Sequence, residues 1–314
     1  MTASDIDHII NHLSLRKSRK RWRWIALGLL AVAALVVLAA LFGNDEPHED
    51  HIARLNVKGL ITGQQSQLDL IRKLKMDDNV KAMIVRIDSP GGTTAGSEAL
   101  YLELRAFAAT KPAVAVMDTV AASGGYIAAI ATDHIVARGN TITGSIGVIF
   151  SYPDISALLG TVGVKMEELK SGEFKAEPSP FKPATEKVKQ VSMAMVDDGF
   201  VWFKGLVSDR RKLTAERTAI LSDGRVYTGR QALKEGLIDA LGGEDEAIAW
   251  LSSEKKIARD LPVINRKSAS TLTDSFMGTS ARTSLLQFIG LSRLDQAAEN
   301  ASLNGLLVLW HPQL

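Results

Sequence analysis

Short apolar runs alternate with helical patterns along most of the chain after residue 51. Over residues 53–57 apolar and polar side chains alternate, which is the period-two pattern of a half-buried strand. Residues 82–87 form an apolar run typical of a buried strand, and over residues 100–107 apolar side chains recur at helical spacing. The chain therefore opens its regular part with strand, strand and helix.

The same rhythm continues further on. Residues 113–117 predict a strand, residues 123–131 a helix and residues 134–137 another strand. A long helix is expected over residues 185–212, which hold no glycine before Gly199. Strands that alternate with helices indicate an α/β domain with a mainly parallel sheet.

A different pattern precedes this domain. Ile25–Gly43 is a run of nineteen residues without a charge. As a helix it would be roughly 28 Å long, close to the ~30 Å hydrocarbon core of a membrane. Trp22 and Trp24 stand where an interfacial aromatic belt would lie. The run predicts a single transmembrane helix. A buried core helix is one alternative, and a signal peptide cleaved near Leu38-Ala39-Ala40 is another.

The charges beside this run predict its orientation. Residues 1–24 carry six Lys or Arg against Asp5 and Asp7. Cations remain on the cytoplasmic side, so we expect a cytoplasmic N-terminus and an exported domain. The expected location is a bacterial inner (plasma) membrane, with the catalytic domain periplasmic. The parts expected along the chain are a basic tail (1–24), a membrane anchor (25–43), a linker (44–51), a folded domain (52–251) and a C-terminal extension (252–314).

Composition narrows the function classes. The chain has 314 residues, of which 46% are hydrophobic and 23% charged, as in globular proteins. It has no cysteine, which excludes a cysteine nucleophile, disulfides and a thiolate metal site. Without the basic tail, the stated net charge of +2 becomes about −2. We therefore expect no nucleic acid partner. The C-terminal extension is expected to be partly extended or flexible, apart from its apolar end at 305–310.

Four short segments carry candidate chemistry. They read DSPGG at 88–92, AASGGY at 121–126, TGSIG at 143–147 and SGEFK at 171–175. Paired glycines after a strand can leave backbone N–H groups free to donate, and a serine at the start of a helix can present its hydroxyl uncrowded. Taken singly, the same segments also fit an ordinary turn, a helix cap and a solvated lysine.

Taken together and in this order, the four segments resemble the signal peptide peptidase A family. A fifth stretch, GRVYTG at 224–229 continuing to GLID at 236–239, matches as well, so the resemblance covers residues 52–250. It implies a membrane-bound serine peptidase with the crotonase/Clp-protease fold, in its short single-domain form. It also implies signal-peptide and other apolar peptide substrates, no cofactor and a homo-oligomer, an octamer by the family's pattern.

The resemblance also implies roles for single residues. The nucleophile falls on Ser123 and the general-base lysine on Lys175, 52 positions later. A second serine, which hydrogen-bonds the lysine, falls on Ser145. The oxyanion hole falls on backbone N–H groups of Gly91 or Gly92 and of Gly124.

A lysine can take a proton from serine only when it is neutral. Free lysine titrates near ~10.4, so a base that is useful at neutral pH needs a pKa lowered by about 2–3 through desolvation. A solvated surface lysine does not meet this condition. The hypothesis therefore requires that Lys175 be buried, in its own chain or by a neighbouring subunit, and that Lys170 and Lys182 cannot replace it.

Other interpretations stay open at this stage. A histidine triad would have to use His134 or His311, since the other four histidines lie in the tail or linker. The same fold also supports acyl-CoA hydratases and isomerases. A non-catalytic scaffold is a further alternative, against which the intact Ser123, Ser145 and Lys175 argue. The main alternative is a related membrane protease that acts on membrane proteins or stomatin-like partners.

Overall fold

The computed structural model describes residues 22–31, 49–267 and 307–309, in two compact units, Met1–His48 and Glu49–Leu314. In the first unit, residues 22–31 are helical. Among the described residues no helix is long and apolar enough to cross a membrane. The predicted anchor, Ile25–Gly43, continues into residues 32–43, which lie outside the described ranges, so the anchor stays a prediction.

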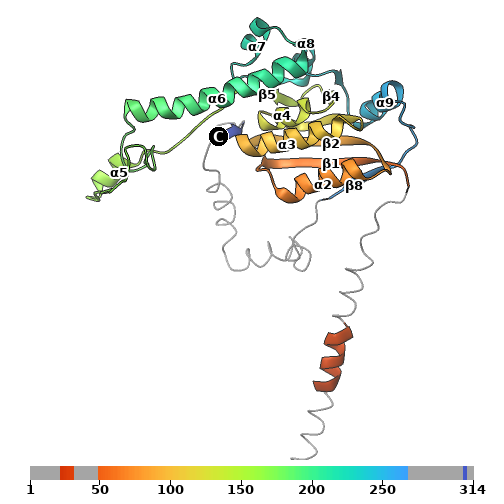
Figure 1. Cartoon of the computed structure of the whole chain (residues 1–314), viewed down its shortest axis with the longest axis horizontal. Coiled ribbons are helices and arrows are strands. Elements are labelled where there is room, and N and C mark those ends of the chain that lie inside the picture. The colour runs from red at the N-terminus through yellow and green to blue at the C-terminus, as the bar shows by residue number, and fades with distance from the viewer. Residues whose placement is uncertain (1–21, 32–48, 268–306, 310–314) are drawn as a thin grey trace, which may run out of the picture. The chain divides into compact units, whose positions relative to one another are not determined.

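The second unit is built on one nine-stranded sheet (Figure 1). Its main path runs β6-β5-β3-β2-β1-β8; β4 joins β3 and β7, and β9 joins β2. Neighbouring strands are parallel except β5–β6 and β2–β9. The strands are β1 (His51–Ile61), β2 (Val80–Thr93), β3 (Ala113–Ala122), β4 (His134–Ala137), β5 (Ile142–Gly144), β6 (Val226–Thr228), β7 (Ala240–Leu241), β8 (Val263–Arg266) and β9 (Leu307–Leu309).

The helices confirm the predicted α/β class. Threonine side chains cap α3, α6, α7 and α8 by accepting a hydrogen bond from the first turn, where backbone N–H groups lack helical partners. The helices are α2 (Gln65–Met76), α3 (Thr94–Ala108), α4 (Gly124–Ile130), α5 (Ser156–Thr161), α6 (Glu186–Arg211), α7 (Ala215–Leu221), α8 (Gly229–Lys234) and α9 (Glu244–Lys255).

Each face of the sheet carries a buried core, and side-chain alternation divides the two. In β1, Leu55 belongs to the larger core, which α2, α3 and α4 help to form, whereas Ile52 belongs to a smaller core with Leu251 of α9. In β2, Val85 and Ile84 divide in the same way. Strands that are covered on both faces read as continuous apolar runs, as residues 82–87 do.

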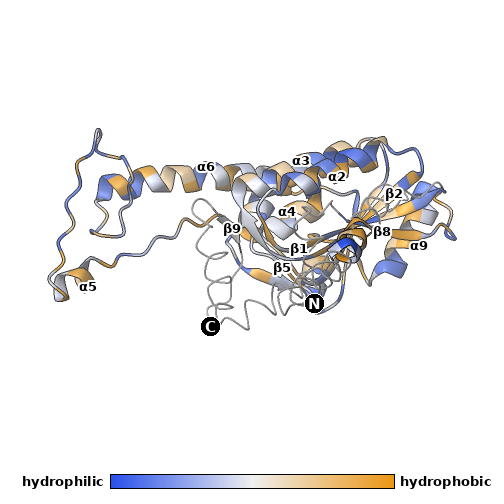
Figure 2. Cartoon of the chain, turned by 90° about the horizontal axis from the view of Figure 1, so that it is seen from below, coloured by the Kyte–Doolittle hydropathy of each residue, from blue (hydrophilic) through white to orange (hydrophobic). Residues whose placement is uncertain are grey.

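One part of the unit stands apart from this layered body. The C-terminal half of α6 buries Phe203 and Val207 in the larger core, but its N-terminal half extends away from the sheet (Figures 1 and 2). Residues 151–184, here called the arm, lead out to α5 and return to the start of α6. Residues 161–169 and 171–176 of the arm are all exposed.

The sheet includes two strands beyond residue 251, where the sequence places the end of the folded domain. β8 pairs with β1 in parallel through Ile52–Leu55. β9, within the predicted C-terminal extension, pairs antiparallel with Gly91–Thr93. Residues 268–306 and 310–314, to which the prediction of a flexible tail also refers, lie outside the described ranges.

Candidate active site

Ser123 stands at the junction between β3 and α4. Its backbone has φ 54° and ψ −114°, a conformation that is uncommon for a residue with a side chain. The side chain is only 1% exposed, and its Oγ has no hydrogen-bond partner among the described residues. A buried hydroxyl without a partner on a sharp strand-to-helix turn is unusual, because burial normally requires a hydrogen bond. Such a hydroxyl is available for chemistry.

Close packing beneath the turn holds it in place. Every residue of α4 is buried. A Cβ on Gly125 would lie 2.6 Å from the carbonyl oxygen of Ser89, so only glycine lets α4 approach β2 this closely. Tyr126 anchors the same helix by donating from its hydroxyl to the carbonyl of Leu237 at 2.8 Å, and burial raises the pKa of that hydroxyl, so it stays protonated.

Ser145 lies beside Ser123 because the two serines follow paired strands. Ala122 of β3 pairs with Gly144 of β5, so the two strands end at the same level of the sheet. The backbone N–H of Ser123 donates to the carbonyl of Gly144 at 2.8 Å. Ser145 also has a positive φ of 51°, is 8% exposed, and donates its own N–H to the carbonyl of Arg225 at 2.8 Å. The structure therefore brings these two predicted site residues together.

The glycine pair completes this corner of the sheet, at the end of β2. Gly91 has φ 113°, and its N–H donates to Ser89 Oγ at 3.1 Å. Ser89 Oγ in turn donates to the carbonyl of Gly59 at 2.7 Å. A Cβ on Gly92 would lie 1.9 Å from the carbonyl oxygen of Ile61, so the position requires glycine. The N–H of Gly91 has a partner in Ser89, and Gly92 pairs in the sheet with Ile61 of β1 and Val308 of β9, whereas Gly124 opens α4, where backbone N–H groups lack helical partners.

Lys175 is not brought to this corner. It lies in a turn of the arm, where its N–H donates to the carbonyl of Gly172 at 3.1 Å, and its side chain is exposed. The arm extends away from the sheet (Figure 1). Because Ser123 Oγ has no described partner, no Ser123–Lys175 hydrogen bond exists within the described part of one chain. The condition that Lys175 be buried is not met by its own chain.

The predicted alternative base, His134, has other partners. Its ring stacks on Trp250 with centroids 4.6 Å apart, and its Nδ1 lies 3.8 Å from Asp239. Burial lowers the pKa of His134, so at neutral pH the ring is mostly uncharged. These contacts lie at the start of β4 and do not include Ser123, whose Oγ lacks a described partner. His311 lies outside the described residues.

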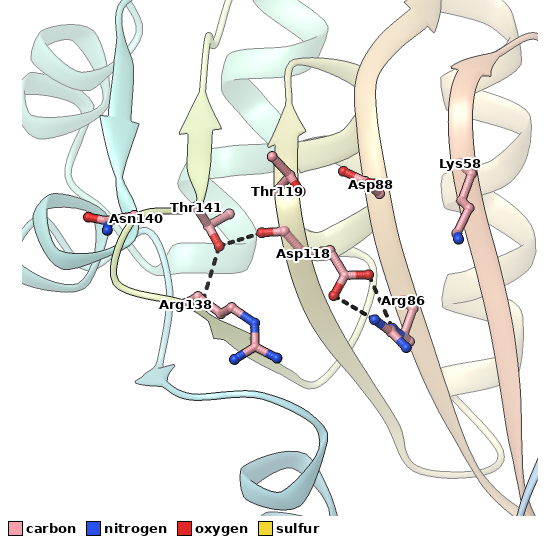
Figure 3. Close-up of a pocket in the computed structure, with 8 residues that line it drawn as sticks. All are labelled: Lys58, Arg86, Asp88, Asp118, Thr119, Arg138, Asn140 and Thr141. Atoms are coloured by element: carbon pink, nitrogen blue, oxygen red, sulfur yellow. Dashed lines mark hydrogen bonds and ion pairs between the residues drawn. The ribbon is translucent and has the colours of Figure 1, made fainter.

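A cavity of about 490 Å³ opens elsewhere on the sheet (Figure 3). Arg86 and Asp118, which line it, alternate with larger-core residues and so share the face of the smaller core. They form a paired ion contact of 2.9 and 3.1 Å. None of the predicted site residues lines this cavity. Its lining consists of Lys58, Arg86, Asp88, Asp118, Thr119, Arg138, Asn140 and Thr141.

Sequence reasoning missed two residues that shape the corner. Ser89 was read only as part of DSPGG, yet its hydroxyl bonds to both Gly59 and Gly91. Arg225 supports Ser145 through its backbone carbonyl, to which any residue type could contribute. The first left a signal, a serine before Pro-Gly-Gly, whereas the second left none.

The profile of Peptidase family S49 matches residues 105–258. A putative protease of Synechocystis sp. is 37% identical over 204 residues, which cover 64% of this chain and 73% of that protein. The chain belongs to peptidase family S49. This confirms the resemblance found in the sequence, and with it the assignment of the chain as a peptidase.

Two further relatives carry more specific names. A putative signal peptide peptidase SppA of Enterococcus faecium is 33% identical and matches 82% of this chain and 88% of its own length. Protease 4 of Salmonella typhi is 35% identical over 70% of this chain, which spans only 35% of that protein. The first has a length similar to this chain, in agreement with the predicted short form.

Solved structures align more loosely. A membrane-bound stomatin-specific protease is 18% identical and covers 71% of this chain and 99% of its own, with a TM-score of 0.43. ClpP1 of Listeria monocytogenes is 13% identical and covers 60% of this chain and 91% of its own, with a TM-score of 0.41. The α/β fold described above rests on the strand pairing of the chain itself.

Proposed function

We propose that this peptidase is a membrane-anchored serine endopeptidase that degrades signal peptides, with Ser123 as nucleophile and Lys175 as general base. The observation that carries the proposal is the buried, unpartnered Oγ of Ser123 on its strained turn, beside Ser145 and the glycine pair. In a family of peptidases, a corner with a free hydroxyl and backbone donors is suited to acyl transfer.

Lys175 enters this scheme from a second copy of the chain. Its own chain leaves it exposed on the arm, and the arm exposes an unusual number of large apolar side chains. A neighbouring subunit that covered the arm would bury these side chains and desolvate Lys175 in the same step. The exposed apolar residues are Tyr152, Ile155, Leu158, Val162, Val164, Met166, Leu169, Phe174 and Phe181.

The proposed reaction has two halves. Neutral Lys175 takes the proton of Ser123 while Oγ attacks the peptide carbonyl, and the N–H groups of Gly91 or Gly92 and of Gly124 stabilise the oxyanion. The lysine then gives its proton to the leaving amine, and the acyl-enzyme remains. Water, deprotonated by the same lysine, releases the second peptide and restores Ser123. Ser145, which lies next to Ser123 in the sheet, would orient the amine of Lys175.

The proposed substrates follow from the expected anchor and from the relatives. A domain held at a membrane by residues 25–43 would meet apolar peptides that remain in the bilayer. The Enterococcus faecium relative is named a signal peptide peptidase, which supports the same substrate class here. We propose a periplasmic location for the catalytic domain and a homo-oligomeric assembly.

Turnover of a fluorogenic, leucine-rich signal peptide by the full chain in detergent micelles tests the proposal. Ser123→Ala and Lys175→Ala should each abolish turnover, whereas Lys165→Ala, an exposed arm lysine, should retain it. Full activity in either of the first two variants would contradict the assigned roles. Turnover of soluble unstructured peptides but not of signal peptides would contradict the substrate class alone.

A further inference from the structure

The arm contains a closed cluster of four charges. Lys170 Nζ lies 2.8 Å from both Glu168 and Glu177, and Lys182 Nζ lies 3.3 Å and 2.6 Å from the same two carboxylates. Each cation therefore contacts each anion. Ser179 adds a bond from its N–H to Glu177 at 3.1 Å and one from its hydroxyl to Glu168 at 3.2 Å.

This cluster is more than a set of surface ion pairs. The Glu177 side chain is only 5% exposed although it lies on the exposed arm. Hydrogen bonds from Lys170, and then from Lys182, lower the pKa of the Glu177 carboxyl to about 2. The same contacts raise the pKa of Lys182 above its ordinary value. Networks of this kind hold a fixed geometry better than isolated exposed pairs do.

The cluster closes the loop that carries Lys175. Lys170 precedes the loop 171–176 and Glu177 follows it, so their ion pair ties the two ends together. At the end of the loop, the N–H of Glu177 donates to the carbonyl of Phe174 at 3.3 Å, and inside it the N–H of Lys175 donates to the carbonyl of Gly172 at 3.1 Å. Residues 171–176 are all exposed, so apolar packing within the chain does not position them. The four charges fix the two ends of the loop, beside its backbone bonds and the exposed Glu173–Lys187 pair.

We propose that Glu177, with Lys170, Lys182 and Glu168, forms a positioning element of the peptidase reaction, which holds the loop 171–176 closed so that Lys175 is presented at one place. The proposal rests on the proposed role of Lys175 as general base. A base that must reach a serine on another subunit cannot rely on its own core for orientation, and a misplacement of about 1 Å can reduce the rate by on the order of 100-fold.

The same segment offers a matched control. Glu173 pairs with Lys187 at 3.4 Å, but the two side chains are 60% and 72% exposed. Glu173 lies inside the loop and is as close in sequence to Lys175 as Glu177 is, on the other side. Unlike Glu177, it pairs with no second cation among the described residues. Glu177→Gln and Glu173→Gln each remove one negative charge near Lys175 while keeping the side-chain shape. Only the first opens the cluster.

The experiment compares these variants in the full chain, with kcat and KM for a leucine-rich fluorogenic signal peptide, oligomer mass and Tm. Glu177→Gln should lower kcat by on the order of 100-fold, leave KM within about twofold, and leave oligomer mass and Tm unchanged. Glu173→Gln should match the wild type in all four. Lys182→Met, which removes one cation of the cluster, should also lower kcat, but by less than Glu177→Gln does.

Three outcomes would overturn the inference. Equal kcat in Glu177→Gln and Glu173→Gln would show that the cluster does not position the base. A loss of oligomer mass or of Tm in both Glu177→Gln and Lys182→Met would show a purely structural role. A rise in KM at constant kcat would place the cluster in substrate binding. Lys175→Ala distinguishes the two proposals, because only if it retains turnover does the assigned base itself fail.

Discussion

The corner around Ser123 and the arm around Lys175 are constructed in opposite ways. At the corner, paired strands, buried glycines and a fully buried α4 position two serines and leave the Ser123 hydroxyl without a partner. In the arm, most side chains are exposed and a cluster of four charges replaces the apolar core. The nucleophile is thus placed by the fold of one chain, whereas the proposed base needs a second chain to be buried.

This difference means that assembly of the oligomer can control the lysine of a Ser–Lys pair but not the serine. A serine in a rigid corner is present in every folded chain. A lysine that loses its water only on assembly is an effective base only in the oligomer. A monomer would then be an inactive form of the enzyme, which suits a peptidase that must not cleave while it is being made.

The largest loss of activity is expected from a change at the corner around Ser123. Ser123→Ala should lower turnover by at least about 10⁴-fold, because the nucleophile itself is lost. Since Ser123 Oγ makes no described hydrogen bond, the same variant should keep its Tm. Steady-state kinetics and thermal unfolding of one preparation check both statements. A large fall in Tm would mean that the hydroxyl has a structural partner.

A pair of glycine variants compares the packing of the two regions. Gly92→Ala places a methyl group 1.9 Å from a backbone oxygen and should lower the free energy of unfolding by about 3 kcal/mol. Gly172→Ala in the arm has no atom within 4 Å of the new methyl group and should change it by less than about 0.5 kcal/mol. Urea unfolding measures both. Equal effects would contradict the contrast between core and arm.

Ser145→Ala tests how the corner meets the arm. If this hydroxyl orients the incoming lysine, kcat should fall by about 100-fold. The backbone bond from Ser145 to Arg225 remains in the variant, so the fold should persist. Rates of Ser123 labelling by a fluorophosphonate give a second reading, and an unchanged labelling rate would remove Ser145 from the site.

A smaller effect is expected from single polar contacts. Tyr126→Phe removes the bond to the carbonyl of Leu237 and should lower the free energy of unfolding by about 1–2 kcal/mol, because a buried acceptor loses its donor. Lys187→Ala removes an exposed pair of the arm and should change stability by close to zero. Urea unfolding measures the loss of stability in both variants. A larger loss in Lys187→Ala than in Tyr126→Phe would contradict the prediction.

The smallest expected effect concerns pH. The pKa of Glu177 is lowered to about 2 in the folded chain from an ordinary value of 4.5. Its contribution to the order of the arm is therefore complete above about pH 5 and is lost as the pH falls toward 2. Amide hydrogen exchange of residues 171–176, corrected for the intrinsic rate, should be flat from pH 5 to 9. Loss of protection between pH 5 and 7 would contradict the charged cluster.

The contrast also explains what the sequence revealed. The strand predicted at 134–137 matches β4, because burial of a strand leaves an apolar pattern. The helix predicted at 185–212, a stretch without glycine before Gly199, matches α6 within one residue at each end. The register that places Ser145 beside Ser123 left no such period, since it depends on how β3 and β5 pair. The motifs supplied the two serines only through a family resemblance.

The arm was the part that the sequence could not describe. Its large apolar residues, such as Leu158 and Leu169, are exposed, so their pattern in the sequence does not reflect burial within their own chain. From the sequence, Lys170 and Lys182 are only neighbours of Lys175 that cannot replace it as the base. Their contacts with Glu168 and Glu177 arise from folding of the loop, and no fixed helical or strand spacing marks them.

Mixing two inactive variants tests the central claim most directly. If each site takes Ser123 from one subunit and Lys175 from its neighbour, oligomers assembled from equal amounts of Ser123→Ala and Lys175→Ala chains should regain roughly one quarter of wild-type turnover, since that share of sites draws both intact residues. If both residues act within one chain, every site carries a defect and the mixture stays inactive. Recovery near one quarter is the predicted result, and an inactive mixture of correctly assembled oligomers would contradict it.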